Sequence, residues 1–226
     1  MLKVRFFAVL LVAFLAVGCT HDMALRKGQE NVDLSKQSLA LLTVKVANQN
    51  KPAYQPNKML FFIEGAGNGA YKVVMKSPPH RMEKGSFSEF LLSFGLKPGI
   101  SKIYKIWPIY AGTFVGGHAT VMTDYSVDMK PDTVVYLGHM DIVIRAKKSD
   151  DEPSAGPLLP LIDQAVTGFS NGALDMVVED RFDDDMKWFA SEYPGLKNVA
   201  VEKAVLPPWT RPGQKKAEES KTDNAQ

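Results

Sequence analysis

The chain has 226 residues, a formal net charge of +2 and a single cysteine. Removal of residues 1–18 takes away Lys3 and Arg5, which leaves 25 basic against 25 acidic side chains. This neutral balance offers no support for nucleic-acid binding. A single cysteine excludes an intrachain disulfide and a metal site built on cysteines, so a hydrophobic core has to stabilise the fold.

The first nineteen residues follow the three-part layout of a secretory signal peptide. Lys3 and Arg5 supply a positive start, residues 6–17 contain no polar side chain, and residues of small or modest size precede Cys19. A signal that ends at a cysteine resembles the bacterial lipoprotein signal. The resemblance implies cleavage before Cys19 and acylation of its thiol, so Cys19 is the predicted lipidation site.

Two other roles for this segment can be weighed. Twelve apolar residues in a helix rise about 18 Å, well short of the roughly 30 Å hydrocarbon core, which argues against a membrane span. An ordinary cleaved secretory signal stays open, and it would leave Cys19 as a free thiol. Lipoproteins retained in the inner membrane often carry Asp after the cysteine, whereas this chain has Thr20. By that resemblance we expect anchoring to the outer membrane, with the chain facing the periplasm.

Composition divides the remaining chain into three parts. Residues 19–37 are polar and charged with scattered apolar side chains, and we expect them to form a lipidated tether that holds the domain away from the bilayer. Residues 38–209 contain enough apolar sequence for one domain. Residues 210–226 offer almost nothing to bury and are predicted to be disordered.

Short apolar segments separated by turn residues predict a series of β-strands within residues 38–209. In the first of them, Leu42, Val44 and Val46 alternate with polar residues. The predicted strands are 39–47, 59–64, 71–75, 87–94, 100–109, 119–127, 133–137, 140–146, 173–178 and 199–206. Their spacing, with glycine and proline at the boundaries, favours a β-sandwich or barrel.

One long connection interrupts the strand series. Residues 147–172 contain several prolines and glycines, and a connection of this length is uncommon unless it is functional or disordered. The leucine-rich part of it, residues 158–166, could form a short buried helix. We therefore treat residues 147–172 as a candidate site element.

An amphipathic helix is predicted for residues 180–193. One apolar stripe recurs with the helical period, and it consists of Phe182, Met186, Phe189 and Tyr193. The carboxylates of residues 183–185 fall in the first turn, where the helix dipole favours them. A solvated helix start explains the acidic residues at 180 and 183–185 better than a Ca²⁺ site, because their spacing lacks that of an EF-hand loop.

Two segments resemble a known kind of β-sandwich. Residues 96–99 (Leu-Lys-Pro-Gly), between two predicted strands, resemble the strand–turn–strand hairpin of transthyretin-like and carboxypeptidase-regulatory-like domains. Residues 132–138, and the helix before a last strand, are similar to an uncharacterised group of bacterial lipoproteins built on such a sandwich. The resemblance implies a mainly β fold: an antiparallel, transthyretin-like or Ig-like β-sandwich with one C-terminal amphipathic helix. It brings no catalytic residues with it.

Aromatic residues around a glycine-containing segment form the best candidate ligand site. Trp107, Tyr110 and Phe114 lie close together in sequence, and His118 follows two glycines. Partly exposed rings in an irregular loop could stack on a sugar or grip a peptide. Core packing explains the same aromatic residues without a ligand.

No reactive constellation stands out in the sequence. The histidines at 80, 118 and 139 lack a second ligand at metal-binding spacing, and no Gly-x-Ser-x-Gly motif marks a nucleophile. We therefore predict no catalytic residue, no metal and no cofactor.

These observations favour a non-catalytic outer-membrane lipoprotein that binds or scaffolds an envelope protein or a glycan, held to the membrane by its lipid anchor. Two alternatives stay open. The first is a cell-envelope hydrolase that acts through carboxylates such as Asp124 or Asp141. The second is an accessory subunit of a secretion or surface-assembly machine, which would be favoured by a large exposed apolar patch around residues 147–172.

Overall fold

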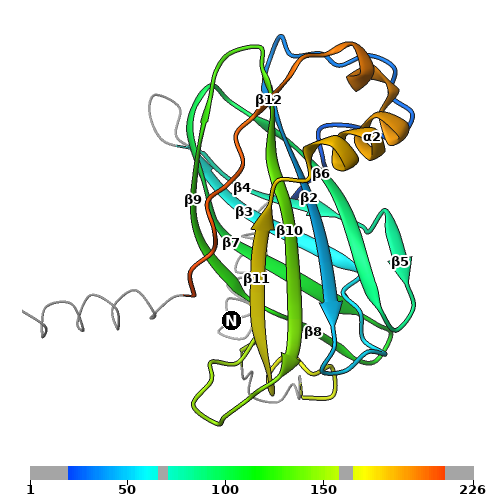
Figure 1. Ribbon diagram of the computed structural model, residues 1–226, viewed down its shortest axis with the longest axis vertical. Helices are drawn as coiled ribbons and strands as arrows, with labels where there is room; N and C mark the ends of the chain where they lie inside the picture. Colours follow the sequence, from blue (N-terminus) through cyan, green and yellow to red (C-terminus); the bar gives the residue numbers. More distant parts are fainter. Residues whose placement is uncertain (1–19, 66–70, 158–164, 212–226) are drawn as a thin grey trace, which may run out of the picture.

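The computed structural model describes residues 20–65, 71–157 and 165–211. Within these residues, two β-sheets pack face to face and one α-helix lies outside the second sheet (Figure 1). The prediction of a mainly β sandwich with a C-terminal helix is confirmed.

Sheet A has the strand order β1-β4-β3-β7-β8, and β9 also pairs with β7. Its strands are β1 (Thr20–His21), β3 (Lys58–Gly65), β4 (Tyr71–Ser77), β7 (Gly99–Ala111), β8 (Gly116–His118) and β9 (Val121–Met129). Because β8 and β9 pair with successive parts of β7, together they form one edge of the sheet. The short strand β1 forms the opposite edge and runs parallel to β4.

Sheet B has the strand order β11-β10-β2-β6-β5, and β12 also pairs with β10. Its strands are β2 (Ser38–Asn48), β5 (Arg81–Glu83), β6 (Phe87–Leu96), β10 (Val134–Ala146), β11 (Gly172–Glu179) and β12 (Val201–Lys203). Most pairs in the two sheets are antiparallel, but β10 runs parallel to β2 and to β12. The two strands predicted at 133–137 and 140–146 form the single strand β10.

Alternating side chains place the main core between the sheets. On β2, Leu42, Val44 and Val46 are fully buried, as the alternation predicts. Phe61 of sheet A meets Phe94 of sheet B with ring centroids 5.0 Å apart. Burial of each such side chain stabilises the fold by about 1.5–3 kcal/mol, so this layer supplies the main driving force.

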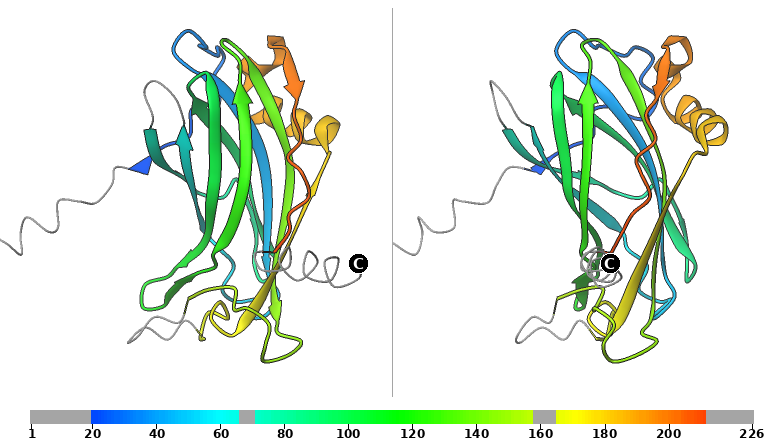
Figure 2. Two further views of the ribbon diagram at one scale, coloured as in Figure 1. Left: turned by 90° about the vertical axis from the view of Figure 1, so that its left-hand side faces the viewer. Right: turned by 60° about the vertical axis from the view of Figure 1, so that its left-hand side comes forward.

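A second apolar cluster lies on the outer face of sheet B, beneath α2 (Phe182–Glu192) and the 3₁₀ helix η2 (Pro194–Asn198) (Figure 2). Its buried members are Leu25, Leu39, Leu41, Leu91, Val134, Phe189, Tyr193 and Leu196. Residues 39–42 of β2 form an unbroken apolar run because both faces of this part of the strand are covered. No helix of the described chain has the length and apolar character needed to cross a membrane.

Residues 21–34 do not form a free tether, and this part of the prediction is wrong. Leu25 is buried in the second cluster, and Met23 packs against the main core. The Gly28 N–H donates to the Glu192 carbonyl at 2.8 Å. We call residues 21–34 the N-terminal strap. Most of its apolar residues pack against the second cluster, whereas Met23 packs against the main core.

The C-terminal segment, residues 204–211, runs along the side of the sandwich where β9 and β11 lie (Figure 1). The Leu206 N–H donates to the Leu137 carbonyl, and the Leu206 side chain is buried in the main core. The indole Nε1 of Trp209 then donates to the Met122 carbonyl of β9 at 3.0 Å. This segment links the two sheets at their edges, and residues 212–226 of the predicted tail lie outside the described structure.

The turn at residues 96–99 connects the two sheets, so the hairpin expected there is not formed. β6 pairs with β2 and β5 in sheet B, whereas β7 pairs with β3, β8 and β9 in sheet A. Gly99 has a φ of 107°, a conformation that favours glycine. The Pro-Gly turn was recognisable in the sequence, but which sheet each strand would join was not.

Candidate functional site

A cleft of about 760 Å³ lies at the β11 edge of the sandwich, and a smaller hollow of about 160 Å³ adjoins it. The loop after β10, strand β11 and the end of the C-terminal segment form its walls. The residues that define its chemistry are Arg145, Lys148, Glu152, Asp175, Trp209 and Arg211. The connection 147–172 therefore contributes to the cleft through its first part, whereas residues 158–164, which carry most of the predicted buried helix, lie outside the described residues.

Arg145, on β10, organises one side of the cleft. Its Nη2 and Nη1 atoms donate to the two carboxylate oxygens of Glu152 at 2.6 and 2.9 Å, a bidentate arrangement. Its Nε donates to Asp175 Oδ2 at 2.5 Å. The guanidinium is thereby held in one orientation by two carboxylates from different segments.

Glu152 fixes the loop through the same contact. Its Oε2 also accepts the backbone N–H of Lys148 at 2.6 Å. The hydrogen bonds from Arg145, followed by that from Lys148, lower the pKa of Glu152 to about 2. The carboxylate is therefore ionised at every pH relevant to the cell, and the ion pair holds the loop against β10.

Arg211 and Trp209 form the other side of the cleft. Arg211 Nη2 donates to the Leu174 carbonyl and, at 2.9 Å, to Asp175 Oδ1. Asp175 therefore accepts from arginines on two different segments. Trp209, half-buried, lines both hollows, and its indole N–H is already satisfied by Met122. Its ring packs partly against the main core and contributes an apolar surface to both hollows.

The cleft is formally neutral in charge. Three cationic side chains line it, Arg145, Lys148 and Arg211, together with the three carboxylates of Asp151, Glu152 and Asp175. A neutral, concave, polar surface that contains one aromatic ring suits a ligand with many hydroxyl or amide groups, such as a glycan or a peptide. It does not suit a polyanion.

The four aromatic and histidine residues predicted as a ligand site do not form one group. Trp107 and His118 lie together, with ring centroids 4.5 Å apart. Tyr110 instead packs against the main core and makes an edge contact with Tyr54 at 5.2 Å. Phe114 is 97% exposed in the turn between β7 and β8. None of the four lines the described clefts.

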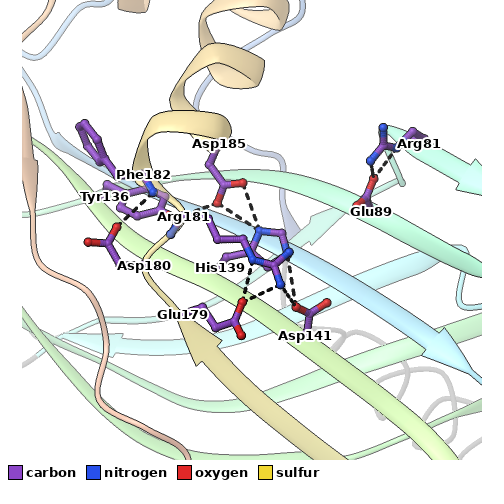
Figure 3. A network of polar contacts seen from close by, with 10 residues as sticks. All are labelled: Arg81, Glu89, Tyr136, His139, Asp141, Glu179, Asp180, Arg181, Phe182 and Asp185. Carbon is purple, nitrogen blue, oxygen red and sulfur yellow. Dashed lines mark hydrogen bonds and ion pairs between the residues drawn. The ribbon is translucent and has the colours of Figure 1, made fainter.

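A second polar cluster lies beneath the first turn of α2 (Figure 3). The hydroxyl of Tyr136 donates to Asp185 Oδ2 at 2.7 Å, and His139 Nδ1 lies 3.1 Å from Asp185 Oδ1. Arg181 Nη1 lies 3.3 Å from His139 Nε2, and Arg181 Nη2 donates to Asp141 at 2.7 Å. Burial, followed by the hydrogen bond to Asp185, raises the pKa of Tyr136.

A β-bulge in β10 brings Tyr136 and His139 onto the same face of sheet B. Tyr136 pairs with Leu41 and His139 with Thr43, so β10 contains one more residue than β2 over this stretch. Gly138, at the bulge, has a φ of 115°. Without the extra residue His139 would point into the main core, whereas with it the imidazole faces Asp185.

The polar partners define which nitrogen of His139 carries a proton. A carboxylate such as that of Asp185 only accepts hydrogen bonds, and a guanidinium such as that of Arg181 only donates them. The neutral imidazole with its proton on Nδ1 satisfies both neighbours. His139 is 4% exposed and Asp185 is 5% exposed. Since Tyr136, His139 and Asp185 are buried and bound to one another, the cluster attaches α2 to sheet B.

The acidic residues at 180 and 183–185 were predicted to be solvated at the start of the helix, and Asp185 does not follow this prediction. Asp183 and Asp184 are exposed, as expected, but Asp185 points inward to Tyr136 and His139. Among the residues that the structure describes, no group of three or more His, Cys, Asp or Glu side chains could hold a metal ion.

The carboxylates named for a hydrolase lie on different sheets. Asp124 is on β9 and forms an ion pair with Lys102 at 2.6 Å, with its side chain 79% exposed. Asp141 is on β10 and is bound by Arg181. Their neighbours Tyr125 and Ile142 are buried in the core, so the two carboxylates point outward on opposite faces of the sandwich. They do not converge on one reacting atom.

No family model, no curated protein and no solved structure matches the chain. The transthyretin-like lipoprotein group and the lipidation of Cys19 therefore stay predictions, and Cys19 lies outside the described residues.

The connection 147–172, named as a candidate site element, contributes Lys148 and Glu152 to the cleft, but Arg145, Trp209 and Arg211 were not predicted. Arg145 ends a predicted strand and Arg211 falls in the predicted tail, so neither carried a local motif. Trp209 follows Pro207-Pro208, which indicated only the end of the domain. The position of Trp209 directly after two prolines was the one local feature that could have marked it as a candidate site residue.

Proposed function

We propose that this chain is a lipid-anchored protein of a bacterial outer membrane, related to transthyretin-like envelope lipoproteins, and that it acts as a non-catalytic binding module. Its partner is a neutral, polar envelope component, a glycan or a protein segment, which binds in the cleft between the loop after β10 and residues 207–211. The observation that carries this proposal is the cleft itself, which is lined by a half-buried Trp209 and by two arginines held in place by carboxylates.

The character of the polar groups supports binding. Arg145 and Arg211 have side chains only 18% and 15% exposed, and each is bound by carboxylates. Such groups keep their positions when a ligand arrives, so little conformational entropy is lost on binding. The aromatic ring supplies the apolar contact, and the loop carbonyl, hydroxyl and carboxylate groups supply the hydrogen bonds.

The N-terminal segment that precedes the folded domain supports the lipid anchor. The apolar segment 6–17 and Cys19 follow the lipoprotein pattern, and acylation with more than one chain makes release from a bilayer slow, because each buried methylene contributes about 0.8 kcal/mol. Mass spectrometry of the full-length product tests this part directly. We expect a mature chain that begins at an acylated Cys19.

Co-sedimentation with purified cell-wall sacculi, and with an immobilised neutral peptide library, tests the binding. We expect the acylated protein to bind one of these two probes and Trp209→Ala to reduce that binding at least tenfold, which corresponds to about 1.4 kcal/mol. Phe114→Ala is the matched control, because it also removes an aromatic ring but lies outside the cleft. Equal losses in the two variants, or no binding to either probe, would show that the cleft is not a binding site.

A further inference from the structure

Four residues lie in one row across sheet A, starting at its β1 edge. Thr20 pairs with Val74 on β4, Val74 pairs with Phe62 on β3, and Phe62 pairs with Lys105 on β7. Neighbouring strands are about 4.8 Å apart, so the backbone of Lys105 lies roughly 14 Å from that of Thr20. Cys19 is bonded directly to Thr20, with no residue between it and the first paired strand.

An ammonium group lies among aromatic rings on the outer face of sheet A, over β3, β7 and β8. Lys105 Nζ is 3.9 Å from the ring centroid of Phe62, 4.6 Å from that of Trp107 and 5.9 Å from that of Tyr104. Phe62 and Trp107 touch edge to face with ring centroids 4.6 Å apart, and the ring centroids of Trp107 and His118 are 4.5 Å apart. We call these five residues the aromatic face.

Lys105 has no ion-pair partner among the described residues. Two neighbouring lysines of this sheet do have one, since Lys76 pairs with Asp22 at 3.5 Å and Lys102 pairs with Asp124 at 2.6 Å. The Lys105 ammonium is instead held over π faces, which attract a cation without neutralising its charge. It can therefore still attract an anion from outside the protein.

The two sheets differ in what covers them. The N-terminal strap, α2 and η2 lie over the outer face of sheet B, whereas no described helix or strand lies over the outer face of sheet A (Figure 2). The face is half-buried by its own packing and combines lysine with tryptophan and tyrosine. Lysine, tryptophan and tyrosine are typical of the surface where proteins meet the headgroup layer of a membrane, because the lysine stem buries apolar atoms while its ammonium stays in the headgroups.

Geometry relates this face to the anchor. Acyl chains on Cys19 have to enter the bilayer, so Thr20 would lie at the headgroup layer, which is only about 6 Å thick on each side. The N-terminal strap cannot act as a spacer, because it follows β1 and is packed on the fold. The row from Thr20 to Lys105 then starts at the membrane surface, and the adjoining aromatic face is the uncovered surface next to it.

From these relations we infer that the aromatic face of sheet A lies on the phospholipid headgroups of the bilayer that holds the anchor, with the Lys105 ammonium binding a headgroup phosphate. The inference rests on the proposed acylation of Cys19. One consequence concerns the cleft. β1 and β9 lie at opposite edges of sheet A, and the C-terminal segment is bound to β9. The cleft is therefore at the edge away from the anchor, where it can reach an envelope partner.

Tryptophan fluorescence can test this orientation, because the three tryptophans lie in three different regions. Trp107 is on the aromatic face, Trp188 is on α2 and Trp209 is in the cleft. The full-length acylated protein is reconstituted into vesicles of phosphatidylethanolamine and phosphatidylglycerol with brominated acyl chains, which quench nearby indoles. We expect quenching of the wild type, loss of most of it in Trp107→Phe, and its retention in Trp188→Phe and Trp209→Phe.

A lysine pair tests the phosphate contact. Lys105→Ser should reduce the lipid-dependent quenching of Trp107, and Lys45→Ser should leave it unchanged. Lys45 is the matched control because its Nζ lies 4.4 Å above the ring of Phe87 on sheet B. Equal quenching in Lys105→Ser and wild type would overturn the headgroup contact.

Mass spectrometry of the same samples distinguishes a failure of the proposed acylation from a failure of the proposed orientation on the membrane. If Cys19 is unmodified, the anchor is wrong and the orientation is wrong with it. If Cys19 is acylated but the quenching is absent, or is lost in Trp188→Phe or Trp209→Phe rather than in Trp107→Phe, the anchor stands and the orientation alone is wrong.

Discussion

His139 Nδ1 lies 3.1 Å from Asp185 Oδ1, although the two residues are 46 positions apart in the sequence. The contact exists because a bulge turns His139 outward and the first turn of α2 places Asp185 above it. Both side chains are nearly inaccessible to water. The attachment of α2 to sheet B therefore depends on buried polar groups as well as on the apolar cluster around Phe189.

Gly138→Ala should destabilise the protein by about 1–3 kcal/mol. Gly138 has a φ of 115°, and a Cβ there would lie 3.2 Å from side-chain carbons of Val178 and Val205. Urea unfolding measures the loss. Gly85→Ala is the control, since Gly85 has a φ of 77° but nothing within 4 Å of an added Cβ, and it should cost less. Equal costs would show that crowding at the bulge is unimportant.

Tyr136→Phe should cost about 1–3 kcal/mol, because it leaves the buried Asp185 carboxylate without its closest donor. Tyr125→Phe is the matched control. The Tyr125 hydroxyl is buried and has no hydrogen-bond partner in the described structure, so its removal should leave the unfolding free energy unchanged or raise it. The difference between the two variants gives the free-energy cost of losing the hydrogen bond to Asp185, because both variants lose a buried hydroxyl group. If the two variants unfold alike, the buried cluster contributes nothing specific.

Stability should fall as the pH drops below 6.5, through His80 and His118. Burial lowers the pKa of both imidazoles from an ordinary value of 6.5. The unfolded chain then binds more protons than the folded chain, so this stability is complete above pH 6.5 and is lost as the pH falls through the lowered folded values. Urea midpoints across this range measure the slope.

His80→Asn should flatten that slope. His80 Nδ1 accepts the Leu91 N–H at 3.1 Å and His80 Nε2 lies 2.8 Å from the Tyr193 hydroxyl, a geometry that requires the neutral ring. The contribution of Glu152 belongs to a separate, more acidic range, because its folded pKa is about 2. An unchanged slope in His80→Asn would exclude His80 as a source of the pH dependence.

Gly195→Ala should release the N-terminal strap. An added Cβ would lie 2.8–2.9 Å from backbone atoms of Glu30 and Asn31, which cannot move without breaking the bond from the Gly195 N–H to the Gln29 carbonyl. Limited proteolysis should then cut within residues 21–34 faster than in the wild type. Gly116→Ala is the control, because its nearest contact would be an ordinary 3.5 Å. Unaltered cleavage would show that the strap is held by other contacts.

Local pattern was sufficient for most of the strands and for α2. Alternation at Leu42, Val44 and Val46 and the stripe ending at Phe189 and Tyr193 are properties of neighbouring residues, so they can be recognised without the fold. The strap was missed for the opposite reason. Leu25 is a single apolar residue in a polar segment, and only its position beside α2 makes it part of a core.

The site residues also divide into those that a local pattern indicates and those that only distant contacts bring together. Trp107 and His118 were both named as candidate ligand residues, and they lie together because β8 pairs with β7 directly after the turn. Tyr110 was assigned to the same group but lies on the inner face. The cleft combines Arg145 with Arg211, which are distant in sequence, and no local pattern indicates that Asp175 accepts from both.

By itself, the sequence determined the balance of basic and acidic side chains after residue 18, the lipoprotein-like start and a β-sandwich with a late helix, since these depend on composition and on periods of a few residues. Only the tertiary structure decided which strands share a sheet, that the predicted tether is a packed strap, that Asp185 is buried and where the cleft forms. Those features depend on contacts between residues far apart in the chain, and the chain's local preferences do not specify such contacts.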